Sequence, residues 1–176
     1  IEELGYKVEF VDYHVGAPVI AENADSKNKF VRKLEKGLET FRYQAPLSHK
    51  LSFIRYKQAF AKKYMPLLGI TDEMNYNPTL DCLVIGSDEA FNCIQKNSNV
   101  GYSTELFGKD NHADRLITYA ASFGNTTLEK LGKYQKANEV GSLLKKFDAI
   151  SVRDANSGSI VAQLTGKEPV YNLDPV

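Results

Sequence analysis

Three short apolar runs, each ending in small or polar residues, constrain the fold of this chain more than any other feature. They read DCLVIG, LITYAA and DAISV and lie at 81–86, 116–121 and 148–152. Apolar runs of this length are typical of strands that are covered on both faces of a parallel sheet. We therefore expect three parallel strands, with 81–86 at the centre of the sheet.

Helical periodicity fills the segments between and after these runs. Apolar residues recur every three or four positions in 126–134, 138–147 and 155–164, and Gly166 is placed to cap the last segment. Strands that alternate with helices along the chain form parallel sheets with right-handed crossovers. The pattern predicts an α/β fold, a Rossmann-like parallel sheet with flanking helices.

The start of the chain has the same character. Residues 1–6 have the pattern of a last helical turn closed by Gly5, and Lys7–Tyr13 is a β-rich run. A strand that follows a helix in an α/β layer pairs with a preceding strand, which we expect before Ile1. The predicted Rossmann-like domain covers 1–172 and is incomplete at its N-terminus.

A helical excursion over about 26–65 interrupts this domain. Ser48 is placed to cap a helix that continues to Tyr64. Aromatic residues recur at helical spacing in it, at Phe53, Tyr56, Phe60 and Tyr64. Such a stripe usually packs in a core, so we expect a buried face. The basic residues beside it keep an RNA-binding surface open as an alternative.

Residues 173–176 have the pattern of the start of a linker. Pro175 restricts Asp174 to extended backbone geometry and suits a connection between domains. We expect a C-terminal domain of the same protein to follow.

Composition excludes several classes of function. Lys plus Arg and Asp plus Glu number 22 each, so the net charge is zero, which argues against a dedicated nucleic-acid binder. Cys82 and Cys93 have no metal-site spacing, and we expect no bound metal and a reducing compartment. No apolar run approaches the length of a membrane span. These features favour a cytoplasmic protein, and a peripheral position at the inner membrane face remains compatible with them.

Polar residues follow each of the three apolar runs. They are GSDE at 86–89, ASFGN at 121–125 and SVRD at 151–154. We call these three polar segments the strand tips. Ligands of open α/β sheets bind beyond the carboxyl ends of the strands, so we expect the strand tips to converge on one binding crevice. Arg153 is a bidentate donor suited to a phosphate or carboxylate, and it could equally anchor the tips.

Other common catalytic signatures are missing from the sequence. No GxGxxG fingerprint, Walker P-loop or G-x-S-x-G motif occurs, which leaves nucleotide-cofactor chemistry without support. His14, His49 and His112 lie in unrelated polar surroundings. His14 closely follows a predicted strand and is the best placed of the three to act as a general base.

Four segments carry motifs that belong together. They are DCLVIGSDEAFN at 81–92, ITYAASFG at 117–124, FDAISVRD at 147–154 and LDP at 173–175. In this order they resemble the motifs of the polysaccharide pyruvyl transferase family. The predicted strand Lys7–Tyr13 resembles the segment that follows the first helix in that family. Two positions depart from the family pattern, with Phe91 in place of a usual tryptophan and Cys93 in place of a usual proline. Phe91 keeps an aromatic ring to fill this position, which we call the aromatic plug, but it lacks the indole N–H donor of tryptophan.

The resemblance implies the amino-terminal half of a two-domain GT-B-type enzyme with its active site between the halves. Such enzymes transfer a pyruvyl group from phosphoenolpyruvate to sugar hydroxyls of a bacterial cell-surface polysaccharide, forming a pyruvate ketal. Phosphoenolpyruvate is the donor substrate, and no cofactor is implied. The acceptor is a glycan or a lipid-linked oligosaccharide.

The resemblance also implies a division of labour within the enzyme. The arginine and histidine residues that hold phosphoenolpyruvate are expected mainly in the carboxy-terminal half. This half would bind the acceptor through the strand tips, at Gly86, Ser87, Asp88, Asn92, Ser122, Gly124 and Arg153. An alternative is a GT-B-like glycosyltransferase or glycan-binding half-module without phosphoenolpyruvate chemistry, and a standalone interaction domain is a third reading.

Overall fold

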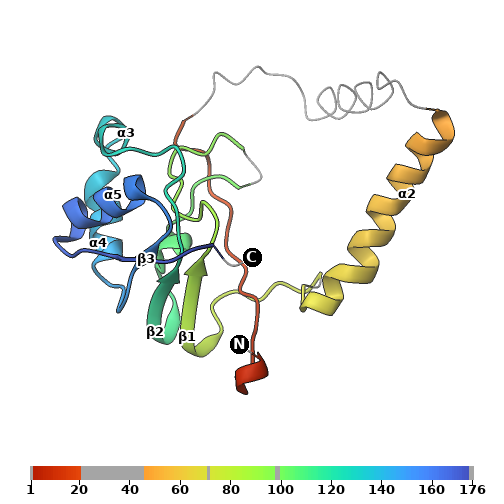
Figure 1. Ribbon diagram of the computed structural model, residues 1–176, viewed down its shortest axis with the longest axis horizontal. Helices are drawn as coiled ribbons and strands as arrows, with labels where there is room; N and C mark the ends of the chain where they lie inside the picture. The colour runs from red at the N-terminus through yellow and green to blue at the C-terminus, as the bar shows by residue number, and fades with distance from the viewer. Residues whose placement is uncertain (1, 21–45, 71, 98–99, 175–176) are drawn as a thin grey trace. The chain divides into compact units, whose positions relative to one another are not determined.

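The structure is a computed structural model that describes residues 2–20, 46–70, 72–97 and 100–174. The chain divides into two compact units (Figure 1). The first comprises 1–10 and 22–74, and the second comprises 11–21 and 75–176.

Two small parallel sheets form the centre of the second unit. Strand β1 (Thr79–Gly86) pairs in parallel with β2 (His112–Tyr119), and β3 (Ser151–Val152) pairs in parallel with β4 (Val170–Tyr171). Single parallel bridges join Ile117 to Ala149 and Ala121 to Val152, so β3 lies beside the end of β2. The prediction of an α/β fold with parallel strands is confirmed.

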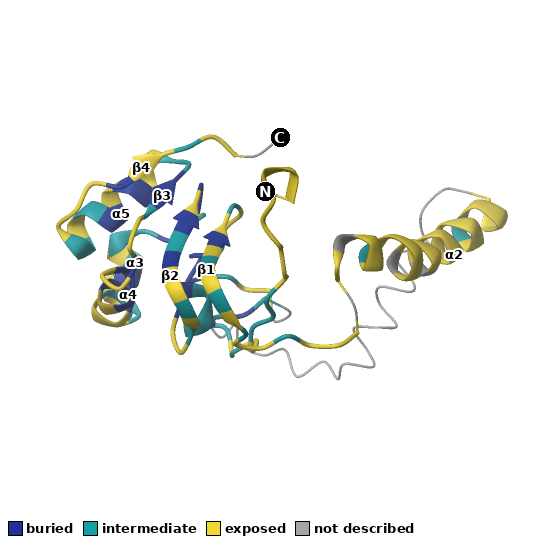
Figure 2. Cartoon of the chain, turned by 90° about the horizontal axis from the view of Figure 1, so that it is seen from below, coloured by how far each residue is buried: buried dark blue, intermediate teal, exposed yellow. Residues whose placement is uncertain are grey.

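Three helices of the second unit follow the predicted segments closely. They are α3 (Leu128–Lys133), α4 (Ala137–Leu144) and α5 (Ala155–Thr165), and in Figures 1 and 2 they group together on the β2 side of the β1–β2 pair. Gly166 ends α5 in the left-handed conformation, with φ 77°, which confirms the predicted cap. A short 3-10 helix, η3 (Thr104–Phe107), precedes β2.

The core of this unit is built around buried aromatic rings. Phe91 has no exposed surface and stacks on Phe107 with a centroid distance of 4.7 Å. Phe123 and Phe147 pack against the same ring at 5.2 and 6.0 Å. The predicted aromatic plug at position 91 is therefore confirmed. Figure 2 shows the buried residues gathered in β2, β3, α4 and α5.

Two strand predictions were wrong in part. The run 81–86 does form a strand, but it does not lie at the centre of a sheet, since β1 pairs with β2 alone among the described strands. It is also not covered on both faces, since Val84 is 44% exposed and Ile85 is the residue buried within it. The run Lys7–Tyr13 forms no strand beyond a single bridge from Asp12 to Tyr76. The Asp12 carboxylate accepts a hydrogen bond from the backbone N–H of Asn75 at 2.7 Å. A side-chain hydrogen bond thus replaces part of the backbone hydrogen bonding that a strand would have.

The first unit contains the long helix α2 (Leu47–Tyr64), with a 3-10 turn η1 (Glu2–Leu4) before it and a 3-10 turn η2 (Met65–Leu68) directly after it. Gly5 closes η1 with a positive φ of 85°, as predicted. The expected cap at Ser48 was wrong, because Pro46 is the N-cap residue and its carbonyl oxygen accepts hydrogen bonds from His49 and Lys50. The part of the excursion at 26–45 lies outside the described residues.

The aromatic stripe of α2 is exposed instead of buried. Phe53, Tyr56, Phe60 and Tyr64 are 52%, 59%, 39% and 41% exposed. Neighbouring rings contact each other along the helix, so aromatic residues at helical spacing do not require a core to pack against. The buried-face prediction was therefore wrong. Among the described residues no helix is long and apolar enough to span a membrane.

Candidate functional site

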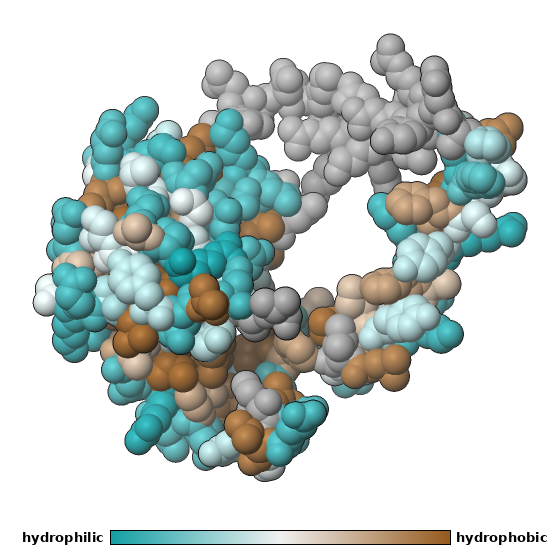
Figure 3. Space-filling model, viewed as in Figure 1, coloured by the Kyte–Doolittle hydropathy of each residue, from teal (hydrophilic) through white to brown (hydrophobic). Residues whose placement is uncertain are grey.

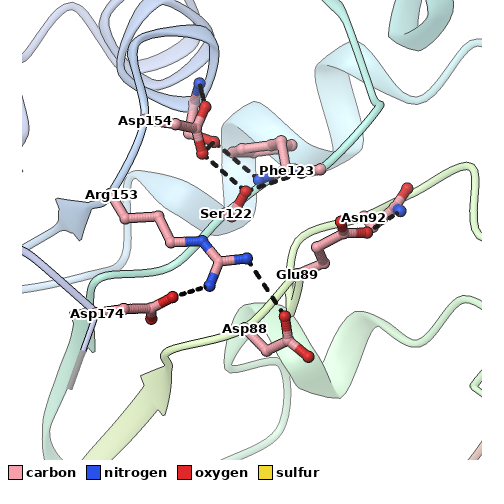
Figure 4. Close-up of polar contacts among 10 residues, drawn as sticks. Asp88, Glu89, Asn92, Ser122, Phe123, Arg153, Asp154 and Asp174 are labelled. Atoms are coloured by element: carbon pink, nitrogen blue, oxygen red, sulfur yellow. Dashed lines mark hydrogen bonds and ion pairs between the residues drawn. The ribbon is translucent and has the colours of Figure 1, made fainter. Parts of the chain in front are cut away.

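The three predicted strand tips meet at one edge of the sheet (Figure 4). The Ser122 N–H donates to the Asp88 carbonyl oxygen at 3.1 Å, and the Phe91 N–H donates to the Ser122 carbonyl oxygen at 3.0 Å. The third tip joins through Arg153, whose Nη2 lies 3.3 Å from Oδ1 of Asp88. The predicted convergence is confirmed, and it follows from the parallel order of the strands.

Glycines allow the chain to pass closely at this edge. Gly86 ends β1 with φ 139°, and a Cβ there would collide with the carbonyl oxygen of Tyr119 on β2. Gly124 has φ 52°, and a Cβ there would meet the carboxylate of Glu89 and lie 3.0 Å from the amide nitrogen of Asn92. Gly86 requires glycine for conformation and for space, whereas at Gly124 the positive φ favours glycine and the crowding comes from side chains, chiefly the end of the exposed Glu89 side chain.

Arg153 is held between two carboxylates in this structure. One guanidinium nitrogen pairs with Asp88 and the other with Asp174, from opposite sides (Figure 4). Burial opposes its charge, but these two carboxylates raise the pKa of Arg153. Of the two roles considered for this residue, the structure shows the anchoring of the tips. Its contact with a ligand remains a prediction.

Asp154 is the central polar residue behind the tips. It caps α5 by accepting from the Ser157 N–H at 2.8 Å, and it also accepts from the hydroxyls of Ser157 and Ser122 at 2.8 and 2.7 Å. Burial disfavours the charged carboxylate, yet these hydrogen bonds hold the pKa of Asp154 below its ordinary value. The Ser157 hydroxyl in turn accepts from the Phe123 N–H at 2.8 Å, so one carboxylate fixes two tips.

Ser122 and Asn92 are buried support for the site. Ser122 is 4% exposed, and its hydroxyl donates to Asp154 and accepts from the Gly124 N–H at 3.0 Å. Asn92 is 9% exposed, and its amide donates to Glu89 at 2.7 Å while its oxygen accepts from the Thr126 hydroxyl at 3.0 Å. The structure thus places both predicted contact residues as positioning residues beneath the exposed tips.

The exposed surface of the tips is rich in carboxylates. The Asp88 side chain is 94% exposed, Asp174 is 45% exposed, and Glu89 is also exposed. Ser87 lies beside them and is partly exposed. With Asp154 beneath, the tips hold four carboxylates and one guanidinium, that of Arg153, which pairs with Asp88 and Asp174. This surface has acceptors for hydroxyl and N–H donors, and its negative charge disfavours a free anion.

His14 belongs to a different group of side chains. Its Nδ1 lies 2.8 Å from Oε1 of Glu105, and its backbone N–H donates to Oε2 of the same carboxylate at 2.6 Å. Its ring stacks on Tyr76 at 4.1 Å between centroids. Partial burial favours neutral Glu105, but the hydrogen bonds from His14 lower the pKa of that carboxyl. The pair has the form of a histidine oriented by a carboxylate, with the His14 side chain 64% exposed.

Several residues at these sites were not among the contact residues expected from the sequence. Glu89 and Asp154 lie within the predicted tips, where Asp154 directly precedes a predicted helix and so had a signal as a cap. Asp174 lies within the LDP motif. Glu105 and Tyr76 had no signal, because they lie 91 and 62 positions from their partner His14.

The described residues contain no group of three or more acidic, histidine or cysteine side chains that could hold a metal ion. Cys93 is buried in the core, and burial raises the pKa of its thiol to about 12. A separate cavity of about 180 Å³ lies at the residues that precede β3 and β4, between Leu144, Val161 and Val170. It lies at the amino ends of those strands and is distinct from the tips.

Comparison with known proteins agrees with these features. Curated proteins and solved structures gave no match to the chain. The family model described as polysaccharide pyruvyl transferase matches residues 1–176. The motifs that build the tips, at 81–92, 117–124 and 147–154, all lie within this match. The chain therefore belongs to the polysaccharide pyruvyl transferase family.

Proposed function

We propose that this chain is the acceptor-binding part of an enzyme that transfers a pyruvyl group from phosphoenolpyruvate to two sugar hydroxyls. The family match supports the reaction class. The observation that carries the acceptor role is the carboxylate-rich surface of the strand tips, with Asp88 almost fully exposed.

The charges of the two substrates support this assignment. Phosphoenolpyruvate is a compact trianion whose binding requires several N–H or guanidinium donors. The guanidinium group at the described tips is that of Arg153, and it already pairs with the carboxylates of Asp88 and Asp174. Sugar hydroxyls are donors, and exposed carboxylates are strong acceptors for them. The tips therefore suit a polyhydroxylated acceptor better than the donor substrate.

The reaction balances with one proton from each hydroxyl. Two acceptor oxygens form bonds to C2 of phosphoenolpyruvate, and the bond from C2 to the phosphate oxygen breaks. One hydroxyl proton ends on the methylene carbon, which becomes the ketal methyl group, and the other leaves with inorganic phosphate. A general base near the hydroxyls accelerates such a step, and we propose Asp88, whose side chain is 94% exposed, for this role.

The rest of the cluster holds Asp88 in place. Arg153 fixes one carboxylate oxygen at 3.3 Å, and the N–H of Ser122 fixes the Asp88 backbone. Asp154 and Ser157 hold Ser122 and Phe123 from below. A rigid backbone of this kind lowers the entropy cost of positioning the acceptor.

The proposal extends to the fold and the location of the protein. A Rossmann-like domain in a GT-B-type enzyme is consistent with the parallel strands and with ligand residues at their carboxyl ends. We place phosphoenolpyruvate on a further domain of the protein, which joins this one after about residue 172. A lipid-linked oligosaccharide acceptor would bring the enzyme to the inner membrane face.

Steady-state kinetics with release of inorganic phosphate from phosphoenolpyruvate tests this function in the intact protein. Nitrophenyl hexosides serve as acceptor probes. Asp88→Asn is expected to lower kcat/KM for the acceptor by about 10- to 100-fold, the worth of a charge-assisted hydrogen bond. The KM for phosphoenolpyruvate is expected to stay unchanged. Asp114→Asn, at an exposed position of β2, is the matched control.

Two results would count against the proposal. A raised KM for phosphoenolpyruvate in Asp88→Asn, with normal acceptor kinetics, would assign the tips to the donor. Acceptor binding to the wild-type protein without phosphate release would favour a glycan-binding module, which the same carboxylates would also serve.

A further inference from the structure

Helix α2 carries a continuous strip of exposed aromatic rings. Its members, called the aromatic strip here, are Phe53, Tyr56, Phe60 and Tyr64. The Tyr56 and Phe60 rings lie 5.8 Å apart, and those of Phe60 and Tyr64 lie 4.9 Å apart. Figure 3 shows apolar and hydrophilic side chains alternating along this helix. An exposed strip of this kind usually marks a contact surface.

The charge of the helix is entirely positive. Between Leu47 and Tyr64 five residues are Lys or Arg and none is Asp or Glu. At about 100° per residue, Lys57 and Lys63 flank the aromatic strip on its two sides. Lys57 Nζ lies 4.8 Å from the Phe53 ring centre, and Lys63 Nζ lies 5.4 Å from the Tyr64 ring centre. The lysine stems thus border the strip and leave their ammonium groups at its edges.

This combination selects an anionic surface that also accepts aromatic rings. Phenylalanine and tyrosine insert at the headgroup level of a bilayer, while flanking lysines pair with anionic headgroups. A single-stranded RNA would need open ring faces on which bases stack, whereas here neighbouring rings pack on each other.

We propose that α2 is a membrane-surface helix that binds anionic lipid through the aromatic strip and its flanking lysines. The helix would lie in the plane of the interface without crossing the bilayer, which fits its 18 residues and five positive charges. This inference goes beyond the proposed pyruvyl transfer and does not depend on it.

Vesicle sedimentation tests the proposal directly. The protein is expected to sediment with vesicles of phosphatidylglycerol and phosphatidylcholine, and to remain in the supernatant with phosphatidylcholine alone. Binding is expected to weaken steeply as salt rises to about 0.5 M, since screening shortens the range of the attraction. Absence of a preference for the anionic vesicles would overturn the proposal.

Matched variants distinguish a specific role of α2 in vesicle binding from an effect of the protein's net charge. Lys57→Gln with Lys63→Gln is expected to weaken binding by about 30-fold, roughly fivefold for each lysine. Lys145→Gln with Lys146→Gln, an exposed pair that follows α4, removes the same charge and is expected to leave binding unchanged. Equal effects of the two pairs would reduce the interaction to net charge and overturn the role of α2.

A third variant tests the aromatic rings. Tyr56→Ser with Phe60→Ser is expected to reduce vesicle binding at least tenfold with an unchanged Tm, because both side chains are exposed. Two further outcomes would contradict the proposal. One is a stable dimer that this variant dissociates, which would make the strip a subunit interface. The other is tighter binding of a single-stranded oligonucleotide than of anionic vesicles.

Discussion

Replacement of Asp154 by alanine should destabilise the second unit more than any other single polar change at the strand tips. The carboxylate caps α5 and accepts three hydrogen bonds, from the Ser157 N–H and from the hydroxyls of Ser157 and Ser122. Its loss removes the cap and leaves the buried Ser122 hydroxyl without its acceptor.

The size of the effect follows from these contacts. Loss of an N-cap costs about 1 kcal/mol, and a buried hydroxyl left without a partner costs about 1–3 kcal/mol. Together they predict a loss of about 3 kcal/mol in the free energy of unfolding. For a chain of this size that corresponds to a fall in Tm of about 6–12 °C.

Urea and thermal unfolding measure this loss. Asp114→Ala, at an exposed position of β2, is the control and should change the free energy by less than about 0.5 kcal/mol. An Asp154→Ala protein within that same range of the wild type would refute the assignment of Asp154 as the residue that fixes the tips.

The pH dependence gives a second test of the same residue. The pKa of Asp154 is lower in the folded protein, so its contribution is present above the unfolded pKa of about 4. It is lost as pH falls through the folded pKa. Asp154→Asn retains a capping side chain that does not titrate. The stability difference between wild type and this variant should therefore be largest near neutral pH and shrink in acid. Parallel pH profiles would contradict the hydrogen-bonded carboxylate.

Further predictions concern the glycine at the first tip and the histidine pair. Gly86→Ala should cost at least about 2 kcal/mol, because its Cβ would collide with the Tyr119 carbonyl oxygen at a positive φ. Gly132→Ala, in open space on α3, is the control and should be neutral or slightly stabilising in thermal unfolding. Glu105→Gln should cost about 1 kcal/mol at pH 7, because it weakens the contacts to His14. The pKa of Glu105 is lowered by folding, so this difference should shrink as pH falls below about 4 and vanish only below the folded pKa. A constant difference across pH in urea unfolding would exclude an ionised Glu105.

Periodicity was sufficient to predict the regular elements of the second unit. The run at 116–121 overlaps the second half of β2, the run at 148–152 ends in the two-residue β3, and the three helices lie within a few residues of their predicted positions. The exposure of β1 could not be predicted, because an apolar run does not show which neighbours cover it. The exposed aromatic strip of α2 is the same problem, since helical spacing gives a face but not its partner.

The candidate site was also predictable only in part. Parallel topology predicted that 86–89, 121–125 and 151–154 would converge, and they do. The sequence could not show that Ser122 and Asn92 are buried while Asp88 is exposed, because all three are small polar residues at strand ends. Nor could it show that Arg153 pairs with two carboxylates that lie 65 and 21 positions away.

We propose that the strand tips bind the acceptor sugar and not phosphoenolpyruvate, and amide chemical-shift mapping of the protein can distinguish the two ligands. The protein is titrated separately with a nitrophenyl hexoside and with phosphoenolpyruvate. The hexoside is expected to shift the amides of Ser87, Asp88 and Arg153, and phosphoenolpyruvate is expected to leave them unchanged. Shifts at these three amides with phosphoenolpyruvate, and none with the hexoside, would contradict the proposal.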